Sequence, residues 1–313
     1  MFITTLNQLF VLMGFLLTGF ILKKGKLLPD NTATVISRLL NFVLMPATII
    51  NTFMDKFTVD NFINKWHLML YSSVILIGCI IVALILGIFF DRDKYVQRIY
   101  RYSFTVGNFA FLGIAFVEGL APDILFDYLL FILPMNLYTF SLGVAWLIPT
   151  DNSDKKGFSL KCLLNPICIS LVIGGVMGLT NVMRFIPSIF NFLTQVIQGT
   201  AKTMAPMAMI LTGFVIGSRP IVSQLKNHKV YICAVIRLII MPVAIMLILN
   251  AVNADDEILK VALCANAMPL GLNTVVIPSA YGRDPELGGS LALVSLLVSL
   301  VTIPILFGIF FPT

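Results

Sequence analysis

The sequence predicts an all-α polytopic membrane protein with ten transmembrane helices in two inverted five-helix repeats. Three observations support this fold class. Of the 313 residues, 58% are hydrophobic and only 12% are charged. Ten apolar segments are long enough to cross a bilayer, and helix-breaking residues recur in the same order in both halves. Because a soluble domain carries about 25% charged residues, a water-soluble globule is excluded, and so are a disordered chain and a nucleic-acid-binding protein.

The ten segments follow from length and hydropathy. A helix rises about 1.5 Å per residue, so a hydrocarbon core of about 30 Å needs roughly 20 apolar residues. The predicted spans are residues 4–22, 34–53, 68–90, 102–120, 124–148, 166–183, 188–217, 230–250, 258–281 and 289–311. The first is not a cleaved signal peptide, because Lys23, Lys24 and Lys26 follow its apolar stretch instead of preceding it.

The basic residues predict the orientation of the chain. Fourteen of the 21 Lys and Arg residues fall in loops after odd-numbered spans, and four fall in loops after even-numbered spans. By the positive-inside rule, the loops after odd-numbered spans face the cytoplasm. We therefore expect a multi-pass protein of the cell (inner or plasma) membrane with both termini outside the cytoplasm.

The sequence offers no pattern for catalysis or metal binding. The five cysteines form no C-x-x-C pair, and His67 and His228 fall in loops on opposite predicted faces. There is no H-E-x-x-H motif, no P-loop and no pair of intramembrane aspartates. We expect no enzymatic activity, no cofactor and no metal site.

Helix-breaking residues recur in the two halves. Asn108 precedes Gly113 by five residues, and Asn266 precedes Gly271 in the same way, at an offset of 158. Prolines of the second and seventh spans, and of the fifth and tenth, recur at offsets of 160 and 170. Five is an odd number, so the second half must enter the membrane in the opposite sense, as in secondary transporters with inverted repeats. The predicted units are residues 1–149, a cytoplasmic linker at 150–165, and residues 166–313.

The fourth and ninth spans are predicted to be discontinuous. Asn108 lies among glycines in the fourth, and Asn266 and Asn273 lie among prolines and glycine in the ninth. Gly and Pro weaken a helix, and polar groups in the middle of a bilayer need partners. Two broken helices meeting near the midplane would present half-helix N-termini, whose unpaired N–H groups and partial positive charge favour an anion.

The motifs around these breaks resemble the auxin efflux carrier family of bacterial and plant permeases, in particular its bacterial malate- and malonate-transporter-like branch. They are Asn108-x4-Gly113-Ile114, Met268-Pro269-x3-Asn273-Thr274-Val275-Val276, Tyr281-Gly282-x-Asp284, Arg38-x7-Pro46 and Asn165-Pro166. The resemblance covers essentially the whole chain. It implies a crossover of broken helices 4 and 9, a scaffold of helices 1, 2, 6 and 7 that forms a homodimer, and a moving domain of helices 3–5 and 8–10.

The resemblance also implies transport of organic anions such as auxin, malate or malonate. We expect a secondary active or facilitative transporter that works by alternating access, with the substrate carboxylate at the crossover. Its expected partners are a small organic anion, the lipid bilayer and a second copy of the chain. The predicted substrate-binding residues are Asn108, Gly113, Asn136, Asn266, Pro269, Asn273 and Lys202.

Two alternatives stay open: a sodium-coupled symporter of the bile-acid symporter type, and a membrane ligand sensor that does not transport. No Asp or Glu lies at a predicted midplane, so a proton or sodium site would lack a carboxylate, although backbone carbonyls at an unwound helix could bind sodium. Lys202 either lines the cavity, or lies in the membrane interface or at a subunit contact. Arg38 lies near the cytoplasmic start of its span and Arg237 about two turns into its span, and both are predicted to extend to the cytoplasmic interface.

Overall fold

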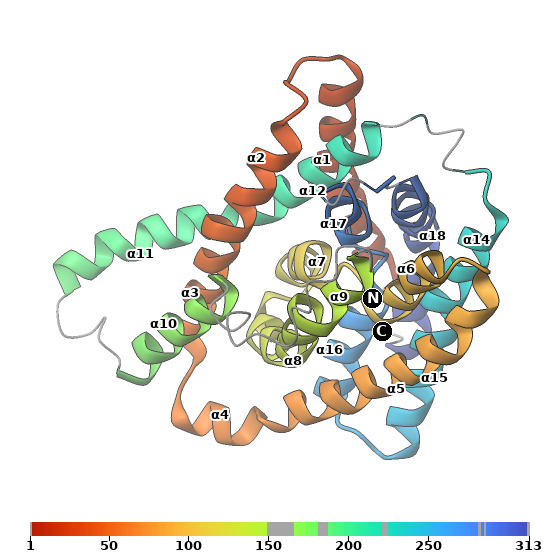
Figure 1. Ribbon diagram of the computed structural model, residues 1–313. Coiled ribbons are helices and arrows are strands. Elements are labelled where there is room, and N and C mark those ends of the chain that lie inside the picture. The colour runs from red at the N-terminus through yellow and green to blue at the C-terminus, as the bar shows by residue number, and fades with distance from the viewer. Residues whose placement is uncertain are drawn as a thin grey trace.

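The computed structural model is a bundle of helices (Figure 1). It describes residues 2–148, 166–180, 187–218, 220, 225–280, 283, 284 and 286–311. The predicted linker at 150–165 and the motif residues Asn165, Tyr281 and Gly282 lie outside the described residues. Between these gaps the described chain is almost entirely helical and contains no β-strand.

One group of helices combines the start of the chain with its middle. Its members are α1 (Phe2–Lys24), α2 (Thr32–Leu39), η1 (Leu40–Leu44), α3 (Met45–Lys56), α10 (Pro166–Thr180), α11 (Pro187–Lys202) and α12 (Met204–Gly217). Helix α1 packs along α12, and α3 packs against α10 and α11. The α1–α12 contact needs glycine, because a β-carbon on Gly19 or Gly213 would collide with the backbone of the other helix. Small residues of this kind let membrane helices approach closely.

A second group contains the remaining helices. The first part is α4 (Val59–Lys65), α5 (His67–Phe90), α6 (Lys94–Thr105), η2 (Phe109–Gly113), α7 (Ile114–Leu120), η3 (Pro122–Ile124), α8 (Leu125–Tyr138), η4 (Thr139–Gly143) and α9 (Val144–Leu147). The second part is α14 (His228–Val235), η8 (Ile236–Ile240), α15 (Met241–Ala251), α16 (Asp256–Asn266), α17 (Asn273–Ala280) and α18 (Glu286–Phe310). Helix α5 packs on α6 and α8, and α18 packs on α14 and α17. The two groups meet where α1 contacts α7 and α18, and where α12 contacts α7 and η2.

Six helices of the described chain are long and apolar enough to cross a membrane. They are Phe2–Lys24, Thr32–Lys56, Val59–Phe90, Asn191–Gly217, His228–Ala251 and Glu286–Phe310. A seventh span results if Pro122–Tyr138 and Ser141–Leu147, bent by 41°, are taken together. The chain is thus a multi-pass helical protein, whereas the predicted count of ten spans is not reached. The fourth and ninth predicted spans are interrupted, and the described part of the sixth has 15 residues.

Four helices of the described chain contain one wide π-helical turn, and two of these turns come just before a proline. The turn η1 precedes Met45-Pro46, and η8 precedes Met241-Pro242. Proline has no N–H and its ring clashes with the carbonyl of the preceding turn, so a widened turn accommodates it without ending the helix. Such turns are frequent at functional sites. Three of the four, η1, η2 and η4, adjoin the cavity described below.

Candidate functional site

The breaks in the fourth and ninth predicted spans touch each other. Residues 106–108 separate α6 from η2, and residues 267–272 separate α16 from α17. Gly107 and Leu270 form an isolated antiparallel bridge, and the backbone N–H of Asn108 donates to the carbonyl of Pro269 at 2.6 Å. We call this contact the break junction. It satisfies backbone groups that the interrupted helices cannot pair themselves, which a membrane interior requires.

Beside the break junction lies a cavity of about 400 Å³. Its walls come from both helix groups, with α2, η1 and α12 on one side and η2, α8, η4 and α17 on the other. It is lined by Ser37, Asn41, Met45, Val106, Gly107, Asn108, Phe109, Ala110, Phe111, Asn136, Thr139, Val144, Leu211, Gly271, Leu272, Asn273, Val276 and Ile277. An apolar cavity with a few converging polar groups is the usual form of a small-molecule site.

Three of the predicted binding residues line this cavity. Asn108 precedes η2, and its Oδ1 accepts a hydrogen bond from the backbone N–H of Leu112 at 3.4 Å. The Nδ2 of Asn273, the first residue of α17, donates to the hydroxyl of the buried Tyr102 at 2.8 Å. Asn136 is 7% exposed, and its Oδ1 is buried without a hydrogen-bond partner. A buried polar atom of this kind needs a partner, which a bound ligand or water would supply.

The two half-helices that begin at the cavity give it a positive character. The η2–α7 segment starts at Phe109 and α17 starts at Asn273, and both residues line the cavity. The first N–H groups of a helix have no partner within it, and its N-terminus carries roughly half a positive charge. No Asp, Glu, Lys or Arg side chain lines the cavity in the described part of the chain. The cavity therefore offers amides, hydroxyls and helix N-termini, all of which suit a carboxylate.

The other four predicted residues do not line the cavity. Gly113 faces Tyr128, whose hydroxyl would collide with a β-carbon there. Asn266 is the last residue of α16, and its Nδ2 donates to the carbonyl of Ala262 at 3.0 Å. The carbonyl of Pro269 forms part of the break junction. Lys202 ends α11 with an exposed side chain.

The cavity also includes polar residues that the sequence prediction omitted. Ser37 and Asn41 lie one helical turn apart on the second span, and Thr139 lies one turn after Asn136 on the fifth. The Nδ2 of Asn41 donates to the carbonyl of Ser37 at 2.8 Å. Residues three or four apart share a helix face, so this spacing in otherwise apolar spans was the signal that could have identified them.

The predicted position of Arg237 is wrong. Its side chain does not extend to the interface; it is 1% exposed, and its Nη1 donates to the carbonyl of Asn266 at the end of α16. The guanidinium also faces Gly107, because a β-carbon added to Gly107 would lie 2.9 Å from Nη2. The cause is a favourable partner at depth: the last carbonyls of a helix are unpaired and its C-terminus is negative.

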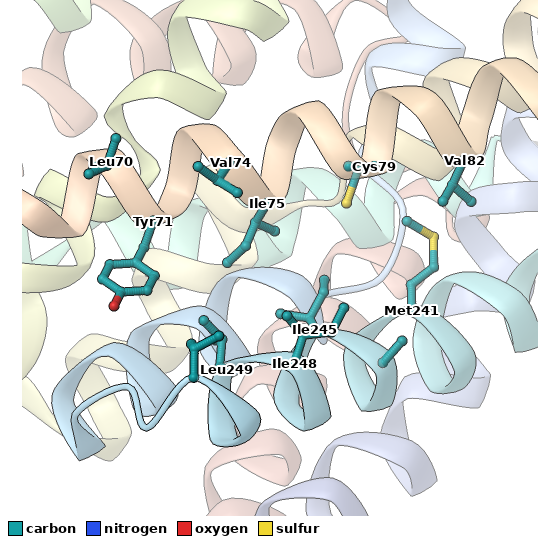
Figure 2. Close-up of a pocket in the computed structure, with 13 residues that line it drawn as sticks. Leu70, Tyr71, Val74, Ile75, Cys79, Val82, Met241, Ile245, Ile248 and Leu249 are labelled. Atoms are coloured by element: carbon teal, nitrogen blue, oxygen red, sulfur yellow. The ribbon is translucent and has the colours of Figure 1, made fainter.

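A second cavity, of about 520 Å³, lies between α5 and α15 (Figure 2). The side chains that line it are almost all aliphatic, with Tyr71 and Cys79 on α5 and Met241 on α15. It contains none of the predicted binding residues. Because no set of polar groups converges on it, it is a weaker candidate for a polar substrate.

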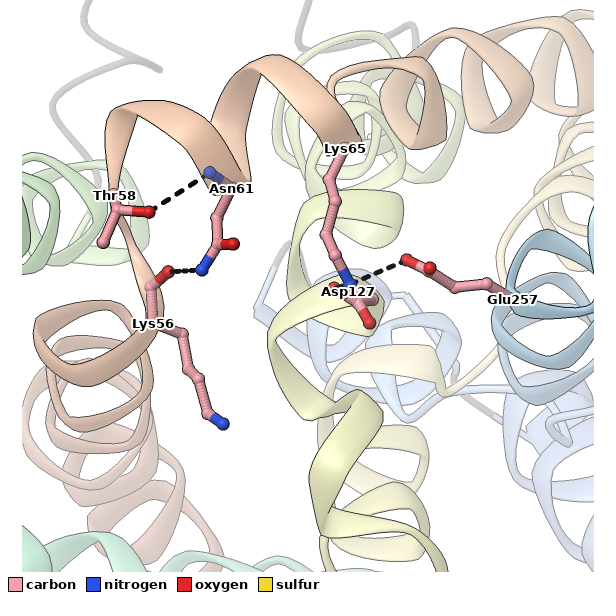
Figure 3. Close-up of polar contacts among 6 residues, drawn as sticks. All are labelled: Lys56, Thr58, Asn61, Lys65, Asp127 and Glu257. Atoms are coloured by element: carbon pink, nitrogen blue, oxygen red, sulfur yellow. Dashed lines mark hydrogen bonds and ion pairs between the residues drawn. The ribbon is translucent and has the colours of Figure 1, made fainter.

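Carboxylates gather away from the cavity, where α4, α8 and α16 meet (Figure 3). The Nζ of Lys65 lies 2.6 Å from Oδ1 of Asp127 and 3.0 Å from Oε1 of Glu257. The start of helix α4 is stabilised by its N-cap, because the hydroxyl of Thr58 accepts from the backbone N–H of Asn61 at 3.1 Å. The cluster ties three segments of the second group together.

The chain is similar to known membrane transport proteins. The family model described as "Membrane transport protein" matches residues 1–154 and again residues 154–307. A protein of Escherichia coli K12 described as "Uncharacterized transporter YfdV" is 23% identical to this chain over 321 residues, covering 96% of each. Proteins with the same description from Escherichia coli O157:H7 and Shigella flexneri match equally.

Proposed function

Because this chain belongs to the membrane transport protein family, which is the auxin efflux carrier family of the sequence resemblance, we propose that it transports a small organic anion across the bilayer. The observation that carries the proposal is the cavity beside the break junction, where the amides of Asn108, Asn136 and Asn273 converge. The proposed substrate is a carboxylate such as malate, malonate or an auxin-like acid.

The proposed mechanism is alternating access, by secondary active or facilitative transport. The cavity lies between the group of α1–α3 and α10–α12 and the group of the remaining helices. These groups correspond to the proposed scaffold of helices 1, 2, 6 and 7 and the proposed moving domain of helices 3–5 and 8–10. A displacement of one group against the other would open the cavity to one side of the membrane and close it to the other.

The full proposed architecture has ten spans in two inverted repeats, 1–149 and 166–313, with crossing helices 4 and 9. The contact between the two breaks supports the crossing, because it pairs the fourth predicted span with the ninth. In this arrangement the short helices of the fourth and ninth spans would each traverse about half of the bilayer. Both termini would lie outside the cytoplasm.

The family resemblance also leads us to propose a homodimer through the scaffold. The exposed apolar side chains of α10 and α11, among them Val172, Val176, Phe192 and Val196, would contact either lipid or the second copy. Cysteine cross-linking between α10 helices in native membranes would test the contact. Cross-linking that occurs only between α5 helices would place the dimer elsewhere.

A flux assay tests the site. Purified protein in proteoliposomes should accumulate radiolabelled malonate or malate, and N108A, N136A and N273A should each lower the initial rate. A lost hydrogen bond of about 1–1.5 kcal/mol corresponds to roughly a tenfold loss per amide. The matched control is N250A, because Asn250 lies on α15 and its Nδ2 donates only to its own helix. Undiminished flux in all three variants would remove these residues from the site.

The two alternatives are distinguished in the same assay. A sodium-coupled symporter would lose flux when sodium is replaced by choline at constant osmolarity. A membrane sensor would show saturable binding of malonate and no flux. The cavity lining, which contains no carboxylate in the described part of the chain, favours the sodium-independent carrier.

A further inference from the structure

Arg237 connects three separate parts of the fold. It belongs to η8, the wide turn in the eighth predicted span. Its side chain is 1% exposed and is the largest of the fully buried side chains in the described part of the chain. Its Nη1 donates to the carbonyl of Asn266 on α16, and its Nη2 faces Gly107, next to the start of η2. One guanidinium thus reaches both interrupted helices, which a planar group with donors along two edges is suited to do.

The charge of Arg237 has no ionic partner in the described part of the chain. No carboxylate forms an ion pair with it, and its Nε is buried without a hydrogen-bond acceptor. The polar groups near it are backbone carbonyls and the thiols of Cys79 and Cys233. A β-carbon on Gly107 would meet the carbonyl oxygen of Met268 at 3.0 Å and that of Pro269 at 3.4 Å, beside Nη2 at 2.9 Å. Carbonyl dipoles and the C-terminus of α16 offset part of the charge.

Gly107 is a neighbour of both the guanidinium and the cavity. It faces Nη2 of Arg237 and it lines the cavity, whereas Arg237 does not line the cavity. Gly107 has no side chain that could stand between the guanidinium and the cavity. In a medium of low dielectric, a buried positive charge next to a cavity-lining residue acts strongly on an ion in the cavity. A substrate anion is the counter-charge that the described part of the chain does not provide there.

We propose that Arg237 is a positioning residue with two roles: its guanidinium fixes the break junction, and its buried positive charge makes the adjacent cavity selective for anions. The second role rests on the proposed function, and the first does not. The two roles also make different demands on the side chain. Fixing the junction needs a fork that reaches both helices, whereas selecting an anion needs only a positive charge.

Two substitutions separate these roles. R237K keeps the charge but replaces the fork with a single ammonium group that cannot span both helices. R237Q keeps a hydrogen-bonding side chain and removes the charge. The matched control is M246A, because Met246 lies on the same span, is also 1% exposed and is outside both the junction and the cavity lining.

Hydrogen–deuterium exchange tests the junction without any substrate. Peptides covering residues 105–113 and 266–274 should exchange at least about fivefold faster in both R237K and R237Q than in the unsubstituted protein. In M246A, the exchange rates of these two peptides relative to those of peptides from the other spans should be the same as in the unsubstituted protein. Wild-type exchange at both breaks in R237Q would overturn the positioning role.

Transport kinetics test the charge. The probes are malonate, with two carboxylates, and its monomethyl ester, with one. R237Q should raise the KM for malonate about tenfold and the KM for the monoester only about threefold, whereas R237K should keep the wild-type ratio within twofold. Equal factors for both probes in R237Q would overturn the charge role. If the unsubstituted protein moves neither these probes nor malate nor an auxin-like acid, the proposed function and the charge role both fail, and the exchange measurement still decides the junction.

Discussion

The backbone N–H of Asn108 and the carbonyl oxygen of Pro269 are 2.6 Å apart, although 161 positions separate them in the sequence. This hydrogen bond makes the two helix breaks one structural element instead of two independent kinks. A Pro or Gly that only bends a membrane helix leaves its freed groups to neighbouring side chains or water. Here each break supplies the backbone partner of the other, so the geometry of one depends on the other.

The close approach at this junction predicts that G107A destabilises the protein. A β-carbon at position 107 would lie 2.9 Å from Nη2 of Arg237 and 3.0 Å from the carbonyl oxygen of Met268. Forcing extra volume into a packed interior costs about 1–3 kcal/mol, so the thermal midpoint in detergent should fall. The control is G78A on α5, where nothing lies within 4 Å of the added carbon. Equal midpoints for the two variants would contradict the close contact.

The hydrogen bond between Tyr102 and Asn273 predicts a binding defect in Y102F. The hydroxyl of the buried Tyr102 accepts from Nδ2 of Asn273 at 2.8 Å and so fixes the orientation of the amide in the cavity. Removal of one such hydrogen bond costs about 0.5–1.5 kcal/mol, so the KM for malonate should rise about two- to tenfold.

The same assay on Y71F provides the control for this effect. Tyr71 lines the other cavity, between α5 and α15, so its hydroxyl should have no influence on malonate uptake. A larger effect in Y71F than in Y102F would point to that cavity as the substrate site.

The sequence predicted the site better at the level of segments than of side chains. Helix-breaking residues predicted interruptions in the fourth and ninth spans, where α6 and α16 end in the structure, and Asn108 and Asn273 line the candidate cavity. The repeat alignment paired Asn108 with Asn266, whereas in the structure Asn108 precedes the second half-helix of its span and Asn266 ends the first half-helix of its own. Which end of a break a residue occupies depends on the number of unwound residues, and a motif does not specify that number.

Hydropathy was least informative about two features: the buried position of Arg237 and the number of membrane spans. A basic residue two turns into an apolar segment is usually satisfied by the interface. Its actual partner, the carbonyl of Asn266, exists only because α16 ends there. The count of ten spans treated each apolar segment as one helix, but a broken segment produces helices that are too short to cross a bilayer alone.

The contacts of Asp91, in the loop between α5 and α6, predict a contribution to the free energy of unfolding that depends on pH. The backbone N–H of Asp93 donates to Oδ1 of Asp91 at 3.1 Å, and Nζ of Lys229 lies 3.0 Å from Oδ2. These donors, Asp93 first, lower the pKa of the Asp91 carboxyl below its ordinary value of 3.8. Because this pKa is lower in the folded protein than in the unfolded chain, the ionised Asp91 stabilises the fold. This stabilisation is present above the pKa of the unfolded chain and is lost as the pH falls through the pKa of the folded protein.

The difference in thermal midpoint between the unsubstituted protein and D91N should therefore be constant from pH 7 to pH 5 and shrink below about pH 4. The pair is solvated, so the whole effect is at most about 1 kcal/mol. K229M should retain part of the dependence on pH, because the N–H of Asp93 remains. A difference that grows as the pH falls would reverse the sign and contradict the assignment.

We expect the two carboxylates that contact Lys65 to contribute unequally to the free energy of unfolding. The side chain of Asp127 is 6% exposed and that of Glu257 is 36% exposed, and both contact the same ammonium group. Loss of one partner of a buried ion pair is costly because the other charge stays buried, whereas an exposed pair contributes about 0–1 kcal/mol. Since Lys65 itself is 26% exposed, D127A should lower the free energy of unfolding by about 2–3 kcal/mol, and E257A by less than about 1 kcal/mol.

Double-mutant cycles with K65M separate the two pairs from the packing of each side chain. The coupling energy between Lys65 and Asp127, measured by denaturant unfolding in micelles, should exceed that between Lys65 and Glu257. Because Lys65 ends α4 and Asp127 lies on α8, the stronger pair fixes the segment between α3 and α5 onto the second helix group. Coupling energies in the opposite order would mean that α4 is fixed to α16 through Glu257, and that burial of Asp127 contributes little to the attachment.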